Sequence, residues 1–174
     1  MTTTPTSTEE KQSAAMRQWT LDVAGSTVEF KVRHIWGLIT VLGHFDRFGG
    51  TYAVGPDSRQ IELTIDADSL DTGRRQRDKH LRSADFFHVT EPPQTRFRSN
   101  SVVDAGDGTL RVSGDLEAAG KTVALSFDAT VREIGDELEI EATTPVDHRL
   151  LDMTWSPLGA LRAPAKLHVK ARLR

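Results

Sequence analysis

The chain has no cysteine among its 174 residues, which excludes disulfides, thiolate catalysis, iron–sulfur clusters and zinc sites with thiolate ligands. It also lacks an excess of positive charge: 22 Lys and Arg stand against 25 Asp and Glu, for a net charge of -3. No global positive field therefore attracts a polyanion, and we expect no nucleic-acid partner. No apolar run is long enough to cross a bilayer, so no transmembrane segment is expected.

The first eighteen residues are mostly Thr, Ser, Glu and Gln, with little apolar content to offset the entropy of ordering. We therefore expect a disordered tail over 1–18 and a single domain over 19–174, opening at Trp19. The tail has neither a basic region nor an apolar core typical of a signal peptide, which favours a cytoplasmic location. The sequence leaves transient membrane contact and a homodimer open.

Apolar and polar residues alternate from Trp19 onward, as in half-buried β-strands. The alternating segments are 28–33, 61–66, 110–116, 123–131, 138–142 and 167–173. Turn signals at hairpin spacing separate many of them, so neighbouring strands are expected to be antiparallel. Only the segment 72–84, rich in Arg, Gln, Lys, His and Leu, is typical of a helix. We predict an all-β fold of about eight strands, with one short helix between the fourth and fifth.

Such strands can form either a sandwich or a closed barrel, and their periodicity does not separate the two. The phenylalanines in or beside the strands favour a barrel with an apolar lumen, although an ordinary packed core explains them equally well. His34 shares the parity of Phe30 and Val32 and should point inward with them. It is a candidate polar anchor for a ligand, or else a core histidine satisfied by a buried hydrogen bond. We expect these three residues to line the same cavity as Phe45 and Phe97.

Motifs for chemistry are scarce. The six histidines form neither a His-x-His nor a His-Glu-x-x-His unit, so we predict no metal site. There is no Gly-x-Ser-x-Gly elbow, and no catalytic residue is assigned. The segment 74–82 carries five permanent cations against one acid, enough to attract a pyrophosphate or another anionic head group. Arg74, Arg77 and His80 are the head-group candidates, and a solvated helix face is the alternative.

Several runs in a fixed order resemble the YceI-like family over the region from Trp19 to about Gly120. The residues that carry this resemblance are Trp19-Thr-Leu-Asp22, Ser26-Thr-Val-Glu-Phe30-Lys-Val-Arg-His34, Gly43-His-Phe45-Asp-Arg-Phe48-Gly-Gly50, Ser69-Leu-Asp-Thr72-Gly73, Arg77-Asp78-Lys-His80-Leu81-Arg-Ser83-Ala-Asp85-Phe86-Phe87, Pro93, Phe97, Ser99, Gly114-Asp-Leu116 and Gly120-Lys-Thr122-Val123. The segment 146–159 departs from the pattern, because it replaces the Arg-rich, Phe-Gly-containing segment usual in the family.

The resemblance implies an extended, antiparallel, eight-stranded lipocalin-like barrel that binds a long apolar lipid. The expected ligand is an isoprenoid, either a polyprenyl phosphate or a quinone tail, held without a cofactor and without chemical change. The expected lipid-binding residues are Phe30, Val32, His34, Phe45, Phe48, Leu81, Phe86 and Phe97. Two alternatives stay open at this point: a histidine-dependent enzyme acting on a lipid-like substrate, and a filled barrel that serves as an interaction module.

Overall fold

The alternating segments build one antiparallel sheet. The computed structural model describes residues 16–34, 39–83, 94–153 and 164–174. The strands in these ranges are β1 (Arg17–Thr20), β2 (Thr27–His34), β3 (Ile39–Phe45), β4 (Phe48–Val54), β5 (Arg59–Asp66), β6 (Leu70–Asp71), β7 (Gln94–Gly106), β8 (Thr109–Ala118), β9 (Lys121–Ile134), β10 (Glu137–Val146) and β11 (Ala165–Leu173). The helices are α1 (Arg75–Leu81) and the short 3-10 turns η2 (Val23–Gly25), η3 (Ala67–Ser69) and η4 (His148–Leu151).

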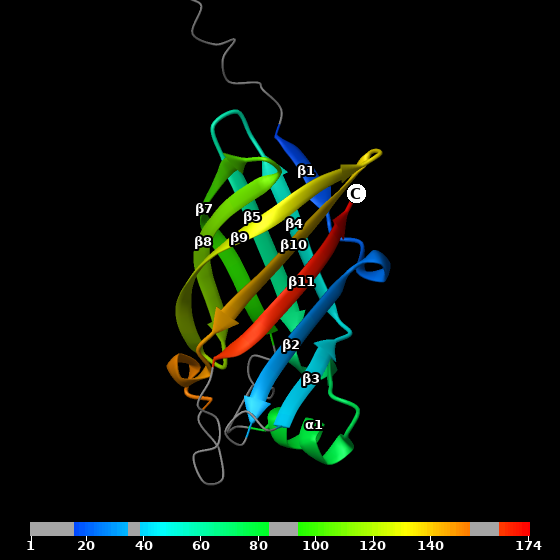
Figure 1. Cartoon of the computed structure of the whole chain (residues 1–174), viewed down its shortest axis with the longest axis vertical. Coiled ribbons are helices and arrows are strands. Elements are labelled where there is room, and N and C mark those ends of the chain that lie inside the picture. The colour runs from blue at the N-terminus through cyan, green and yellow to red at the C-terminus, as the bar shows by residue number, and fades with distance from the viewer. Residues whose placement is uncertain (1–15, 35–38, 84–93, 154–163) are drawn as a thin grey trace, which may run out of the picture.

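The sheet curls into an extended barrel (Figure 1), in the order β1-β4-β5-β7-β8-β9-β10-β11-β2-β3-β6. At the end of β1 the sheet meets the residue that follows β11: the backbones of Thr20 and Arg174 exchange two hydrogen bonds of 2.9 Å. This contact closes a ring of eight strands, from β1 through β11 in the sheet order. The strands β2, β3 and β6 continue from β11 beyond the ring.

The molecule has two different ends. We call the end with the β4–β5, β7–β8 and β9–β10 turns the upper end, and the end with α1 the lower end, as they stand in Figure 1. At the lower end, backbone bonds from Asp46 to Ser69 and from Asp66 to Arg47 tie β3 and β6 to the neighbouring β4–β5 hairpin. Backbone hydrogen bonds therefore join strands that are not neighbours in the sheet order, at β1 and β11 and again at the lower end.

The expected all-β barrel is confirmed, whereas the strand count and the helix position need correction. There are eleven strands in the described ranges instead of eight, and α1 follows β6 instead of the fourth strand. The additional strands include β1 and β6, which are too short to show alternation. The predicted helix over 72–84 shortens to 75–81: Gly73 has a φ of +75°, and Arg74 is extended.

The beginning of β1 lies two residues before the expected start of the domain. Arg17 and Gln18 pair with Val54 and Ala53 of β4. Backbone pairing needs no apolar side chain, which is why composition placed these two residues in the tail. The tail itself stays a prediction.

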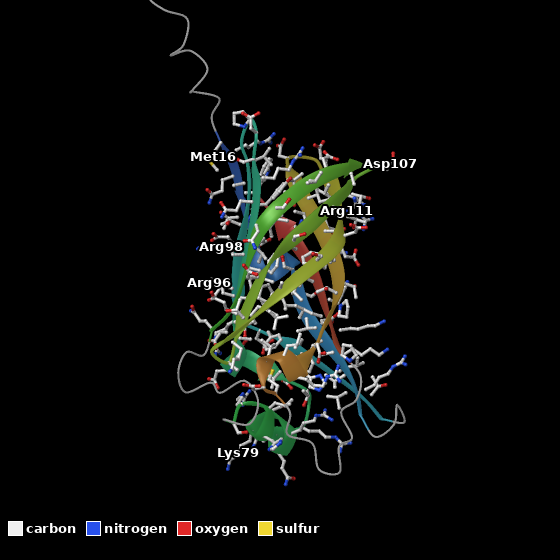
Figure 2. The ribbon with its side chains drawn as sticks, turned by 90° about the vertical axis from the view of Figure 1, so that its left-hand side faces the viewer. Met16, Lys79, Arg96, Arg98, Asp107 and Arg111 are labelled. Carbon is white, nitrogen blue, oxygen red and sulfur yellow. The ribbon has the colours of Figure 1, made fainter. Side chains whose placement is uncertain are left out.

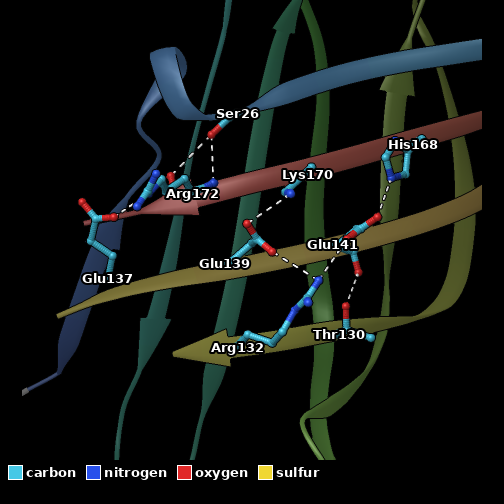
Figure 3. A network of polar contacts seen from close by, with 9 residues as sticks. All are labelled: Ser26, Thr130, Arg132, Glu137, Glu139, Glu141, His168, Lys170 and Arg172. Carbon is cyan, nitrogen blue, oxygen red and sulfur yellow. Dashed lines mark hydrogen bonds and ion pairs between the residues drawn. The ribbon is translucent and has the colours of Figure 1, made fainter. Parts of the chain in front are cut away.

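The strand faces separate apolar from charged side chains as the alternation predicts. Along β10, Leu138 and Ile140 are buried in the core. The alternate residues Glu137, Glu139 and Glu141 point outward and form ion pairs with side chains of β9 and β11 (Figure 3). The wall therefore encloses an apolar interior and presents a charged exterior.

Candidate functional site: an apolar lumen in two cavities

The upper half of the lumen holds a cavity of about 80 Å³. Its wall is mainly aliphatic and aromatic, with side chains from seven strands. Representative lining residues are Tyr52, Leu63, Phe97, Phe127, Ile140 and Val169. Burial raises the pKa of the Tyr52 phenol, so this side chain stays neutral at physiological pH.

The lower half holds a second cavity, of about 110 Å³. Phe30, Val32 and Phe45 line it from β2 and β3, and Leu81 closes it from α1. The rings of Phe30 and Phe45 lie 5.5 Å apart, within the range of favourable aromatic pairs. No Lys or Arg of the described residues lines either cavity.

Two leucines connect the cavities. Leu116 of β8 and Leu167 of β11 line both, so they form the boundary between the upper and the lower space. The inward row of β10 also runs through both, from Ile140 above to Val146 below. The two cavities are therefore consecutive parts of one lumen.

The lower cavity contains two polar side chains that sequence reasoning did not select, Thr95 and His148. Both are 8% exposed. His148 continues the inward parity of Thr144 and Val146 on β10, and this signal could have identified it. Among the described residues, these are the two polar side chains in an otherwise apolar lining.

The position of His148 depends on the turn that carries it. The carboxylate of Asp147 accepts a 3.0 Å hydrogen bond from the Arg149 backbone N–H at the start of η4. The Arg149 guanidinium also donates to this carboxylate and lowers the pKa of Asp147 to about 2. The carboxylate is thus ionised at neutral pH and holds η4 at the lower rim, with His148 in the cavity wall.

The predicted lipid-binding residues divide between the cavities. Phe97 lines the upper cavity, so it does not share the space of Phe30 and Phe45 as we expected. Phe48 packs against both hydrophobic clusters of the core and lines neither cavity. The backbone of His34 belongs to β2, but its side chain lies outside the described part of the structure, as does all of Phe86.

The head-group candidates Arg74, Arg77 and His80 gather on a shallow hollow on the surface of α1. None of them lines the lower cavity, which α1 reaches through Leu81. Arg77 is engaged within the protein, because it donates to the Thr72 hydroxyl at 2.7 Å and to the Thr72 carbonyl at 2.6 Å. These interactions assign Arg77 a structural role at the start of α1.

One group of potential metal ligands was not apparent in the sequence. His44, Asp46 and Asp71 each offer a ligand atom, and these atoms lie within 4.8 Å of one another. They come together only because β6 pairs with the end of β3, which spacing along the chain does not reveal. His44 and Asp46 are exposed, and none of the three residues lines a lumen cavity.

A histidine connects three strands on the outer face. His168 of β11 lies 3.0 Å from a Glu141 carboxylate oxygen on β10 (Figure 3). It also lies 3.4 Å from a carboxylate oxygen of Glu29 on β2. The hydrogen bond to Glu141 is the largest cause of a raised His168 pKa, and the same bond lowers the pKa of Glu141. This cluster lies outside the lumen and contributes to the wall.

The chain folds as an extended, lipocalin-like antiparallel barrel whose lumen holds two consecutive apolar cavities. The sequence profile of the YceI-like domain matches residues 19–173, and the chain belongs to the YceI-like family. Protein YceI of Shigella flexneri is 36% identical over 130 residues, which cover 72% of this chain and 67% of that protein. A UPF0312 protein of Vibrio cholerae is 34% identical over 122 residues, 67% of this chain, and the match spans 64% of the relative's length.

Solved structures share the fold at lower identity. Burkholderia cenocepacia BcnA superposes with a TM-score of 0.80 at 20% identity, covering 87% of this chain and 98% of that one. A polyisoprenoid binding domain from Saccharophagus degradans gives a TM-score of 0.73 at 14% identity, with 90% and 97% covered. Within the described ranges, no helix has the length and apolar character needed to cross a membrane.

Proposed function

We propose that this protein binds a long apolar lipid inside the barrel, an isoprenoid such as a polyprenyl phosphate or a quinone tail, and carries or sequesters it unchanged. The observation that carries the proposal is the pair of consecutive apolar cavities bounded by Leu116 and Leu167. The similar fold of the Saccharophagus polyisoprenoid binding domain supports it.

Apolar burial would supply most of the affinity. Each buried methylene contributes about 0.8 kcal/mol, so a prenyl chain gains free energy with every unit that enters the lumen. The cavities of about 80 and 110 Å³ are smaller than typical ligand pockets, which begin at about 300 Å³. A long chain therefore requires Leu116 and Leu167 to change rotamer and move apart.

A polar head within the lower cavity would meet the side chains of Thr95 and His148. A hydroxyl and an imidazole suit a quinone carbonyl or a hydroxyl better than a phosphate. A phosphate would instead need cations, which the described lining lacks. Comparing the affinities of a polyprenol and its phosphate therefore tests where the head lies.

The decisive variant is Val32→Trp, which places an indole in the lower cavity. Leu42→Trp is the matched control, because Leu42 lies on the neighbouring β3 and is 62% exposed on the outer face. Gel filtration with radiolabelled geranylgeraniol, and with a longer polyprenol, measures retention of the lipid. We expect Val32→Trp to lower the affinity at least about tenfold and Leu42→Trp to leave it within about twofold.

Three other results would contradict the proposal. Wild-type protein that retains neither lipid indicates a filled core, and equal retention by both variants places the lipid outside the lumen. Recovery of a chemically altered lipid indicates an enzyme. Melting temperatures of both variants accompany the assay, because overpacking a filled core costs about 1–3 kcal/mol.

A further inference from the structure

Cations without an ion-pair partner concentrate at one end of the molecule. Most Arg and Lys side chains in the described ranges pair with carboxylates on the outer faces of the strands. Eight exposed cations form no ion pair with any described residue. Two of them, Arg17 on β1 and Arg96 on β7, lie elsewhere, and the other six belong to α1, its N-cap and the adjoining lower parts of β2 and β11. These six, which we call the basic collar, are Lys31, Arg33, Arg74, Arg75, Lys79 and Lys166.

Part of the basic collar lies on the outer face of β2 and β11, two strands that line the lower cavity. On β2, Lys31 and Arg33 alternate with Phe30 and Val32, which line the cavity. Lys166 lies opposite Lys31 in the neighbouring β11. The cations therefore face outward immediately beside apolar residues that face the lumen.

The helix contributes the second part of the collar. Lys79 is two residues before Leu81, which lines the lower cavity, and it projects from the lower end of the molecule (Figure 2). The acid within α1, Asp78, is buried and accepts hydrogen bonds from the Thr72 backbone N–H and hydroxyl. Its carboxylate is thus directed inward, away from the exposed cations.

The opposite end carries more unpaired acids than cations, with Arg17 of β1, opposite Val54, as an unpaired cation there. The three upper hairpin turns contain the exposed residues Asp57, Asp107 and Asp136, for which the described residues provide no ion-pair partner. Asp107 lies at the upper end in Figure 2, far from Lys79. A barrel with a net charge of -3 is thus polarised along its long axis.

We propose that the basic collar docks the lower end of the barrel on an anionic lipid bilayer. Cations near such a surface are attracted to it, and the acidic upper end is repelled, so the axial polarity orients the approach. The lower cavity then faces the bilayer. The role in loading or releasing an apolar ligand rests on the proposed function, but docking itself does not.

A bilayer fits the collar better than a nucleic acid does. The cations gather at one side of the end of an apolar cavity, on β2, β11 and α1, instead of forming a stripe along the barrel that could follow a phosphate backbone. The acidic turns would repel a polyanion long enough to pass along the barrel. Competition by duplex DNA is therefore an outcome that would contradict docking on lipid.

The test uses sedimentation with vesicles of phosphatidylcholine alone or mixed with phosphatidylglycerol. The triple variant R74Q, R75Q, K79Q removes three charges of the collar. The matched control R17Q, R96Q, R111Q removes the same charge from other parts of the surface. We expect the wild type to bind only the anionic vesicles, the collar variant to bind at least about tenfold more weakly, and the control to bind within about twofold. Binding should fall as salt rises.

Several outcomes overturn docking: no sedimentation with anionic vesicles, equal binding to neutral ones, equal loss in both variants, or complete competition by duplex DNA. Melting temperatures verify folding, and K31Q, R33Q, K166Q replaces the first variant if that one unfolds. Retention of geranylgeraniol without vesicles is measured in parallel. A wild type that retains geranylgeraniol but does not bind anionic vesicles contradicts docking alone. A wild type that does not retain geranylgeraniol contradicts the proposed function.

Discussion

The upper and lower ends of the barrel are built from different kinds of sequence. The upper end consists of long hairpins with regular alternation, and the exchange of hydrogen bonds between Thr20 and Arg174 closes it. The lower end is assembled from the two-residue β6, the seven-residue α1 and the short turn η4. Segments with regular apolar–polar alternation therefore form the barrel wall, and short irregular segments add the polar and charged groups near the lower cavity.

The upper wall should be the most sensitive to added volume. A Cβ on Gly114 of β8 would lie 2.7 Å from the Phe97 ring and 2.7 Å from Ser99 Cα, next to an irregular register in β7. The obstacle includes the β7 backbone, which cannot move aside as a side chain can. We expect Gly114→Val to lower the free energy of unfolding by about 3 kcal/mol in urea titrations.

Gly49 of β4 is the matched control, because a Cβ there meets no atom within 4 Å. Gly49→Ala should leave stability unchanged or raise it by about 0.4–1 kcal/mol, since alanine restricts the unfolded chain. Equal destabilisation by both substitutions would contradict the close packing inferred at Gly114.

The lower end should depend on a single buried carboxylate. Asp78 is 7% exposed and accepts a 3.0 Å hydrogen bond from the Thr72 backbone N–H, which fastens α1 to the end of β6. We expect Asp78→Ala to cost about 1.5–3 kcal/mol and to accelerate hydrogen exchange in α1 more than in β8. Asp68→Ala is the control, because its ion pairs at 3.6 Å are exposed and should contribute little. Uniform acceleration in both elements would show that α1 is not an independent unit of the lower end.

The smallest expected effect lies on the outer face between the ends. The His168 pKa is raised above 6.5, chiefly by its hydrogen bond to Glu141. Its contribution to the free energy of unfolding is therefore complete below about pH 6.5 and disappears as pH rises through the raised value. The Glu141 pKa is lowered from 4.5, so its contribution is lost only as pH falls through the lowered value. His168→Gln should cost less than about 1 kcal/mol at about pH 5.5 and still less at about pH 9. A cost that is equal at both pH values would show that the ion pairs contribute nothing.

The difference between the ends also explains what the sequence could predict. Segments such as 61–66 and 138–142 predicted strands correctly, because period-two burial dominates in a one-layer wall. Phe30, Val32 and Phe45 were correctly expected to meet, since parity and aromatic character both place them inward.

The remaining parts depend on contacts between distant segments. His148 is an exception, because its parity with Val146 extends past the end of β10 and could have identified it as inward. Phe97 and Phe30 lie in different cavities because Leu116 and Leu167 form the boundary between them. That boundary forms only when β8 and β11, which are distant in the sequence, come together in the barrel. The segregation of cations likewise appears only when β2, β11 and α1 are brought to one end.

Quantitative mass spectrometry of an organic extract tests the lumen most directly, with wild type, Val32→Trp and Leu42→Trp purified in parallel from the same host. Lipid binding inside the barrel predicts a prenyl lipid that co-purifies unaltered with the wild type and with Leu42→Trp, and is depleted at least about tenfold from Val32→Trp. Absence of lipid from a wild type that also fails to retain added polyprenol, or equal amounts in all three proteins, would contradict it.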